Sequence, residues 1–425
     1  MNRIILMGNG FDLAHRMKTS YRDFLNYFWE ELQVKIQDEI FYEEKYEDDF
    51  IIIDKVPTNW NVGKGFKTIK DSLNNSKTTL RFKNKFLENL SKSNEDLNWV
   101  DIESDYYIFL KKCFQNPTEN YSIKTLNEEF LDIKKLLEDY LKNIEKDFID
   151  NFPSTSYDRD LKRNIYEEIY SDFQIRDFSE ASINKLTEEE FQRVLPHVKG
   201  IEEDLITLEE FQDNEREQRL IASLTNTVNK RKKIRELLVS QTAPNYFRFQ
   251  PKLILFLNFN YTQSEYEYNQ APNDYETGKR ISTLTIHIHG ILGNKRNNKI
   301  IFGFGDEIDN NYKTIEDLND NHYLENIKSI KYLESNSYKS LLEFINSDDY
   351  QIFVFGHSCG ISDRTLLNTL FENKNCASIK PFYRQIDDEK DNYSEIIKNI
   401  TRNFTNKADL RDKVVNKLYT KSLFK

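Results

Sequence analysis

The sequence predicts an α/β protein in which a Rossmann-like, mostly parallel sheet is interrupted by a large all-helical insertion. An apolar run at residues 3–7 leads directly into the Gly-Asn-Gly turn at residues 8–10, and comparable strand-like runs return after residue 251. Between these parts, residues 121–240 repeat apolar side chains at spacings of three and four and lack glycine-rich turns. Strand–turn–helix patterns on both sides of a helical block are typical of an open sheet with an insertion.

The chain has 425 residues, which is more than one compact core usually contains, so we divide it where the pattern changes. We expect residues 1–104 to form the N-terminal part of the Rossmann-like domain. Residues 105–250 are expected to form the helical insertion, and residues 251–425 the C-terminal part of the same domain.

The N-terminal part is predicted to begin with the strand at residues 3–7. Ser20 and Asp23 have the spacing of a near capping box, which predicts a helix over 21–32 with one apolar face. Residues 50–53 are strand-like, within a stretch that otherwise mixes acidic runs and loops. Residues 99–103 (Trp-Val-Asp-Ile-Glu) begin a segment with a helical pattern.

The insertion and the C-terminal part differ in their patterns. Apolar residues from Leu126 to Phe148 predict one long amphipathic helix, and charged helices follow over 160–240. Beyond Pro251 the run at 253–257 is continuously apolar, as in a parallel strand buried on both faces. Further strands are predicted at 284–288, 300–302 and 352–355, with the last at 378–383.

Composition excludes several classes of protein. A net charge of −11 argues against a surface that binds nucleic acid throughout, and we interpret the basic run at 229–235 as a solvated helix face. The sequence has no apolar run of about 18 residues and no signal-peptide pattern, so we predict neither a membrane span nor secretion. Cys113, Cys359 and Cys376 lack C-x-x-C spacing and suggest free thiols in the cytoplasm.

The stretch Gly356-His357-Ser358-Cys359-Gly360 matches the G-x-S-x-G nucleophile elbow of serine hydrolases. That fold needs its histidine after the serine, and no histidine follows Ser358. Two other interpretations remain: a tight strand-to-helix turn, or a turn at a helix N-terminus that holds a phosphate or ribose.

Polar residues at other strand ends suggest further chemistry. His287 and His289 share one face of a strand, a spacing that permits metal binding together with Asp12 and Asp306. One histidine there also suits general-base catalysis, because its pKa lies near neutrality. Asn260, just after the strand 253–257, suits a ribose hydroxyl or a water, or serves as a turn residue.

Taken together, these motifs resemble the AbiH family of bacterial phage abortive-infection proteins. The resemblance rests on a series of short stretches: GNGFDLAH at 8–15, KTSY at 18–21 with Phe24, WVDIE at 99–103, Asn-Tyr at 260–261, His-Gly at 289–290, and FGHS at 355–358 with Asp363. It implies host defence, in which a phage or host protein triggers the response.

The order of the motifs is also similar, more distantly, to sirtuin-like NAD-hydrolase domains of bacterial defence systems. This resemblance implies a sirtuin-like sheet and NAD as substrate or ligand, without a metal. Catalysis would fall to His289 and Asn260. The implied cofactor-binding residues are Gly8, Asn9, Gly10, Asp12, Gly356, Ser358 and Asp363.

In three respects the sequence departs from that pattern. The Pro-Asp-Phe-Arg stretch of sirtuins is absent. Thr262 stands where such domains usually have Asp after the Asn-Tyr pair, and the zinc-binding cysteine quartet of sirtuins is absent. The expected activity is that of an NAD+ glycohydrolase. A nucleotide-sensing module without turnover and a metal-dependent phosphoesterase or nuclease are alternatives, and a homo-oligomer is a further possibility.

Overall fold

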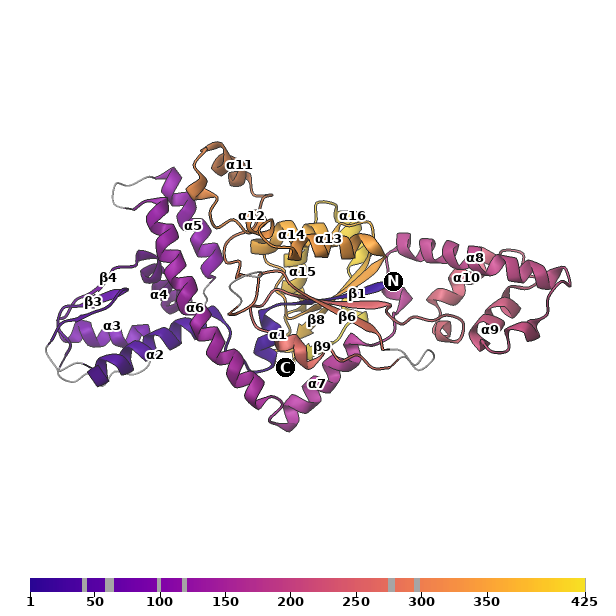
Figure 1. Cartoon of the computed structure of the whole chain (residues 1–425), viewed down its shortest axis with the longest axis horizontal. Helices are drawn as coiled ribbons and strands as arrows, with labels where there is room; N and C mark the ends of the chain where they lie inside the picture. The colour runs from indigo at the N-terminus through magenta and orange to yellow at the C-terminus, as the bar shows by residue number, and fades with distance from the viewer. Residues whose placement is uncertain are drawn as a thin grey trace.

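A six-stranded parallel sheet forms the centre of the protein (Figure 1). The computed structural model describes residues 1–39, 44–57, 65–97, 101–116, 121–273, 280–293 and 299–424. The strands are β1 (Asn2–Met7), β5 (Leu253–Asn258), β6 (Ser282–His287), β7 (Tyr350–Phe355), β8 (Cys376–Arg384) and β9 (Ser422–Phe424). Their order in the sheet is β6-β5-β1-β7-β8-β9, and every neighbouring pair is parallel. Numbered along the chain, this is the 3-2-1-4-5-6 order of a doubly wound Rossmann sheet, so the predicted fold class is confirmed.

Both faces of the sheet are buried under helices. Ile4, Leu6 and Leu257 pack on one side, where α13 (Ser337–Ser347), α14 (Arg364–Phe371) and α15 (Tyr393–Arg402) cover the sheet. Their neighbours on the opposite side pack against α1 (Asn9–Ala14) and α7 (Ser156–Ile169). Successive strand residues point to opposite faces, so continuous apolar runs are what a sheet covered on both sides requires.

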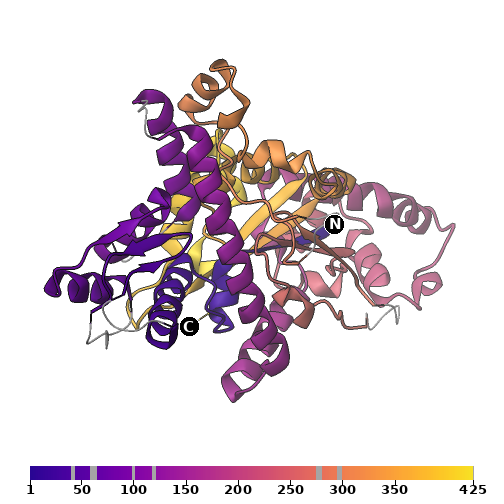
Figure 2. The same ribbon diagram turned by 60° about the vertical axis from the view of Figure 1, so that its left-hand side comes forward.

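Apart from α1 and α7, the helices between β1 and β5 form two lobes at opposite ends of the strands (Figures 1 and 2). The N-terminal lobe contains α2 (Tyr21–Glu39), α3 (Phe66–Asn75), α4 (Lys85–Leu97), α5 (Ile102–Gln115) and α6 (Ile123–Asn151). It also holds a small antiparallel sheet of β2 (Tyr46–Glu47), β3 (Ile51–Ile53) and β4 (Leu80–Phe82). Its core continues into the segments that follow β5 and β6, through Tyr261 and Phe302.

The distal lobe contains α8 (Glu180–Glu202), α9 (Glu215–Leu224) and α10 (Lys230–Val239). Its core includes Ala377 at the start of β8, so this lobe lies at the amino ends of the strands. Because α7 leads back from the N-terminal lobe to the sheet, the helices do not form one continuous body. The division of the chain at residues 104 and 250 stays a prediction.

Several local predictions are confirmed. Ser20 and Asp23 exchange hydrogen bonds, with Asp23 N donating to Ser20 Oγ at 3.1 Å. Helix α2 begins at Tyr21, directly after Ser20. The long helix expected from Leu126 to Phe148 is α6. The strands expected at 3–7, 253–257 and 352–355 are β1, β5 and β7.

The strand prediction at 300–302 is wrong, whereas the strand expected at 378–383 is confirmed except that it is not the last. Residues 300–302 are buried, but they form no ladder, and Ile301 N donates only to the carbonyl of His289. The segment 378–383 lies within β8, but β9 follows it at the edge of the sheet. An apolar run indicates that a segment is buried, and both a strand and an extended loop segment can be buried.

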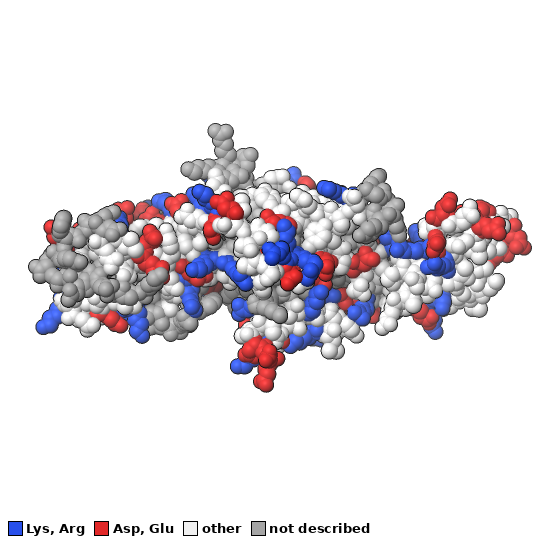
Figure 3. All heavy atoms as spheres, turned by 90° about the horizontal axis from the view of Figure 1, so that it is seen from below, with Lys and Arg blue, Asp and Glu red and all other residues white. Residues whose placement is uncertain are grey.

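The basic run at 229–235 is largely paired within the distal lobe. Arg231 bonds to Glu188 at 2.7 Å and Arg235 to Glu180 at 2.7 Å, both across from α10 to α8. Positive and negative side chains are interspersed on the face shown in Figure 3, with an acidic group at the tip of this lobe. No helix within the described ranges is both long enough and apolar enough to cross a membrane.

Candidate functional site

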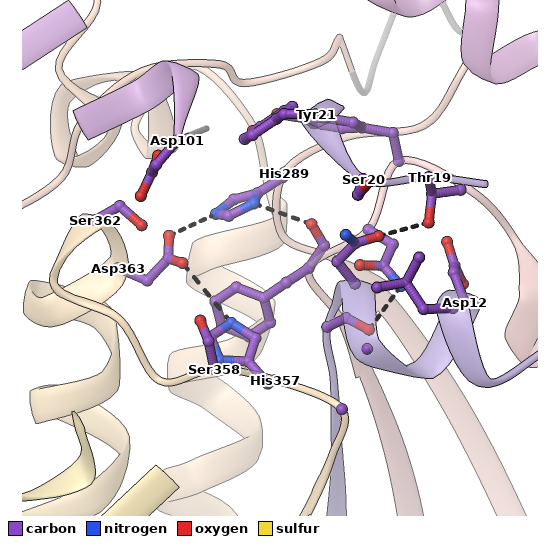
Figure 4. Close-up of a pocket in the computed structure, with 18 of the residues that line it drawn as sticks. Asp12, Thr19, Ser20, Tyr21, Asp101, His289, His357, Ser358, Ser362 and Asp363 are labelled. Atoms are coloured by element: carbon purple, nitrogen blue, oxygen red, sulfur yellow. Dashed lines mark hydrogen bonds and ion pairs between the residues drawn. The ribbon is translucent and has the colours of Figure 1, made fainter. Parts of the chain in front are cut away.

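A cavity of about 840 Å³ lies at the carboxyl ends of the core strands (Figure 4). Its walls come from the segments after β1, β5, β6, β7 and β8, and from α2, α5 and α6 of the N-terminal lobe. The strand order reverses between β1 and β7, and ligands of open α/β sheets bind at such a reversal. Every site residue predicted from the sequence lines this cavity: Gly8, Asn9, Gly10, Asp12, Asn260, His289, Gly356, Ser358 and Asp363.

The loops after β1 and β7 interlock through their glycines. Gly10 N donates to the carbonyl of Gly356 at 2.8 Å. A Cβ atom on Gly8 would lie 2.6 Å from the Cα of His357, and one on Gly10 would lie 2.7 Å from the Gly356 carbonyl oxygen. Contact between the two loops therefore requires glycine at residues 8 and 10, whatever ligand the cavity holds.

Asp12 is buried in the short helix α1, which begins within the glycine turn. The hydroxyls of Thr262 and Ser264 donate to its carboxylate at 2.5 and 2.6 Å. Burial raises the pKa of Asp12 to about 6, although both hydrogen bonds favour the charged form. Thr262, the residue that departs from the sirtuin-like pattern, thus brings a carboxylate from another part of the chain to the Asn-Tyr segment.

Asn260 and Asn9 are held on either side of the glycine turn. Asn260 N donates to Asn258 Oδ1 at 2.8 Å, and its side-chain amide donates to the Gly8 carbonyl at 3.1 Å. The hydroxyl of Thr19 donates to Asn9 Oδ1 at 2.5 Å. Both amides are therefore fixed in the cavity wall by contacts within the protein.

Both ring nitrogens of His289 are in contact with the protein. Nδ1 lies 3.1 Å from the Phe259 carbonyl, whereas Nε2 lies 3.1 Å from the Tyr332 hydroxyl and 3.1 Å from Asp363 Oδ1. Burial lowers the pKa of His289, and Lys328 lowers it further, while Asp363 opposes both. A proton taken up at Nε2 would be held by the Asp363 carboxylate.

Asp363 is the centre of a buried charge network. Lys328 Nζ lies 2.9 Å from Asp363 and 2.7 Å from Glu103, which comes from α5. Burial would raise the pKa of Asp363, but Lys328 and His289 hold it well below its usual range. Burial raises the pKa of Glu103 to about 7 against the attraction of Lys328. This network ties the N-terminal lobe to the core.

Ser358 is exposed on the loop after β7 and is not part of a serine nucleophile elbow. The chain runs irregularly over 356–360 and then through a short 3-10 turn before α14 begins at Arg364. The predicted tight strand-to-helix turn is therefore wrong, and Ser358 does not lie at a helix N-terminus. The Nδ1 atom of its neighbour His357 accepts from Cys359 N at 2.9 Å.

The residues considered for a metal have separate partners. His287 contacts Glu265 at 2.8 Å, away from His289, and Asp306 contacts Arg364 at 3.4 Å. Across the described ranges, no three His, Cys, Asp or Glu side chains are placed to hold a metal ion.

Sequence reasoning missed Lys328 and Tyr332, and it assigned no role to Glu103. Lys328 lies in the polar stretch at 326–331, where nothing separates a buried lysine from an exposed one. Asp101 and Glu103 belong to the WVDIE motif, which was the only available signal. Trp99 and Val100 of that motif lie outside the described residues.

The comparisons with known proteins identify the family. A family model described as bacteriophage abortive infection AbiH matches residues 4–385. Neither a curated protein nor a solved structure matches the chain, so the resemblance to sirtuin-like domains stays a prediction. The matched segment includes the residues that line the cavity except Asn392, Glu395 and Ile396, and the family supports a role in anti-phage abortive infection. The chain therefore belongs to the AbiH family of bacteriophage abortive-infection proteins.

Proposed function

We propose that this AbiH protein binds NAD in the cavity and hydrolyses its nicotinamide–ribose bond during phage defence. The observation that carries the proposal is the position of the cavity at the reversal of a 3-2-1-4-5-6 sheet, where dinucleotides bind in folds of this order. Its volume of about 840 Å³ lies within the range of ligand pockets.

Hydrolysis of this bond requires the protein to orient the ribose and to accept one proton from water. The C1′–N bond breaks with its electron pair leaving on nicotinamide, the ribose passes through an oxocarbenium-like state, and a water oxygen adds to C1′. Asn260 would orient the ribose, and His289 would take the water proton at Nε2, where Asp363 stabilises the resulting imidazolium. Because Nδ1 is bound to the Phe259 carbonyl, the water must reach Nε2 and displace the Tyr332 hydroxyl from it.

The charges that line the cavity support a cationic transition state. Five acidic residues face three basic ones: Asp12, Asp101, Glu103, Asp363 and Glu395 against Arg22, Lys328 and Arg384. Fixed carboxylates stabilise positive charge that develops on the ribose, and they do so more strongly where burial excludes water.

The test is release of nicotinamide from NAD by the purified protein, with and without extract from phage-infected cells. We expect His289→Ala and Asn260→Ala to lower the rate by at least about 100-fold. His322→Ala, a half-exposed histidine outside the cavity, is the matched control. Undiminished release from His289→Ala would remove its catalytic role, and no release under any condition would exclude hydrolysis.

A nucleotide sensor without turnover is the second candidate function. The contacts of His289 favour it, because neither ring nitrogen is free to bind a water. Calorimetry that shows binding of NAD, together with an unchanged NAD concentration after prolonged incubation, would select this function.

A further inference from the structure

An anionic ligand is held most strongly in this cavity where a cation is free, because acidic residues outnumber basic ones. The charge of Lys328 is already engaged by Glu103 and Asp363. Arg22 and Arg384 are exposed, and no ion pair joins either of them to a carboxylate in the part of the chain that the structure describes. These two guanidinium groups are therefore the available anion-binding groups.

Arg384 extends from a fixed backbone at the carboxyl end of β8. Its N–H donates to Asn392 Oδ1 at 2.7 Å, and its carbonyl accepts from Asn392 N at 3.2 Å. Phe382, two residues earlier, is buried and forms part of the same wall. The backbone of Arg384 is thus fixed, while its guanidinium has no carboxylate partner among the described residues.

Ser358 lies on the loop of the neighbouring strand. Phe355 of β7 pairs in register with Phe382 of β8, so the chain segments after these residues leave the sheet side by side. Asn399 of α15 donates to the Ser358 carbonyl at 2.8 Å and fixes the loop while the Ser358 side chain stays exposed. We call Ser358, Arg384 and Asn392 the β8 corner.

We propose that the β8 corner binds the pyrophosphate of the ligand, which makes the ligand a phosphate-bearing dinucleotide; this inference rests on the proposed function. A planar guanidinium matches two phosphate oxygens, and the hydroxyl and amide beside it supply further donors. The turn at residues 8–10 is less suited, because His357 and Gly356 fill the space beside Gly8 and Gly10.

This placement also sets the direction of the ligand. With the phosphates bound at the β8 corner, the uncharged ribose and its base extend toward Asn260 and His289 on the other part of the cavity wall. Arg22 follows Tyr21, which lies across the cavity from Ser358 (Figure 4). Arg22 therefore provides a matched control: an exposed arginine in the same cavity on the opposite wall.

The experiment measures binding of ADP-ribose by calorimetry, because this probe carries the pyrophosphate but has no nicotinamide to release. We expect Arg384→Ala to raise the Kd by about 10- to 100-fold, the range for hydrogen bonds to charged groups. Arg22→Ala should change it by less than about three-fold, because Arg22 is not part of the β8 corner and would not contact a pyrophosphate bound there. Inorganic pyrophosphate should displace ADP-ribose from the unchanged protein but not from Arg384→Ala.

The possible failures are distinguishable. Equal affinity in Arg384→Ala, or a larger loss in Arg22→Ala, overturns the β8 corner and leaves nucleotide binding intact. If the unchanged protein binds neither ADP-ribose nor NAD, both this inference and the proposed function are wrong. Thermal unfolding of each variant shows that it is folded, and both arginines are exposed, so we expect little change in melting temperature.

Discussion

Lys328 is the residue on which the geometry of the site most depends. It is 1% exposed and holds two carboxylates from different parts of the chain, Glu103 of the N-terminal lobe and Asp363 of the core. Removal of one partner from a buried pair leaves a charge without compensation, which destabilises a protein far more than the intact pair stabilises it.

We expect Lys328→Met to lower the free energy of unfolding by about 3–5 kcal/mol. The double variant with Glu103→Gln should recover part of this loss, because one of the two uncompensated carboxylates is then neutral. Lys331→Met, on the same helix α12 (Lys328–Tyr332) and paired at the surface with Glu334, should change the free energy by less than about 1 kcal/mol. Urea unfolding measures all three, and equal effects at both lysines would contradict the buried network.

Asp12 gives the stability a dependence on pH. Its pKa of about 6 in the folded protein lies above the ordinary value of 3.8, so the folded state keeps a proton that the unfolded chain has lost. The resulting stabilisation is complete below about pH 4 and is lost as the pH rises through about 6.

Asp12→Asn removes this dependence. From pH 5 to pH 7.5 we expect the unchanged protein to lose about 1.4 kcal/mol of unfolding free energy relative to Asp12→Asn. This is the free energy that corresponds to one pKa unit. Asp132→Asn on the exposed side of α6 controls for the loss of one carboxylate. Parallel pH profiles for Asp12→Asn and the unchanged protein would show that Asp12 titrates normally.

At the scale of elements, the site is built by two loops that leave neighbouring strands and then pack against each other. Gly356 has a φ of +68°, and a Cβ atom there would lie 2.1 Å from the backbone nitrogen of Phe11. The backbone of one loop thus fills the space that a side chain on the other would need. This contact holds the segments that follow β1 and β7 close together.

Gly356→Ala should therefore destabilise the protein by several kcal/mol, as positive-φ strain adds to a backbone clash. Gly293→Ala isolates the strain, because Gly293 has a φ of +73° and no atom within 4 Å of its added Cβ. That variant should lose only about 1–2 kcal/mol. Similar midpoints of chemical unfolding for the two variants would show that the loops are not in tight contact.

At the scale of the whole molecule, the two lobes differ in their relation to the cavity. The N-terminal lobe contributes Tyr21, Asp101 and Glu103 to its lining, whereas the distal lobe contributes none of the described lining residues. The distal lobe packs at the other end of the strands, through Ala377. A phage or host protein as the trigger stays a prediction.

Hydrogen exchange in the presence of ADP-ribose should reflect this arrangement. We expect protection in the glycine turn with α1, in the segment 356–363 and at the start of α2, because ligand contacts suppress local opening. Helices α8 to α10 should exchange at unchanged rates. Protection confined to α8 to α10 would place the nucleotide elsewhere.

The local elements were predictable because each depends on residues that are close together in the sequence. The run before Gly8 predicted β1, the periodicity from Leu126 to Phe148 predicted α6, and the spacing of Ser20 and Asp23 predicted the start of α2. Strand β9 and the extended segment 300–302 were not predictable, because short or buried segments carry the same pattern whether or not they join a sheet.

The sequence alone thus determined the fold class, the family resemblance and nine of the residues that line the cavity, because glycine turns and polar residues at strand ends are local patterns. Only the tertiary structure decided the strand order, the pairing of Lys328 with Glu103 and Asp363, and the lack of an ion pair at Arg384 among the described residues. A lysine in a polar stretch has no mark of burial in its neighbours. Its partners are set by packing between segments more than 200 residues apart in one case and 35 in the other.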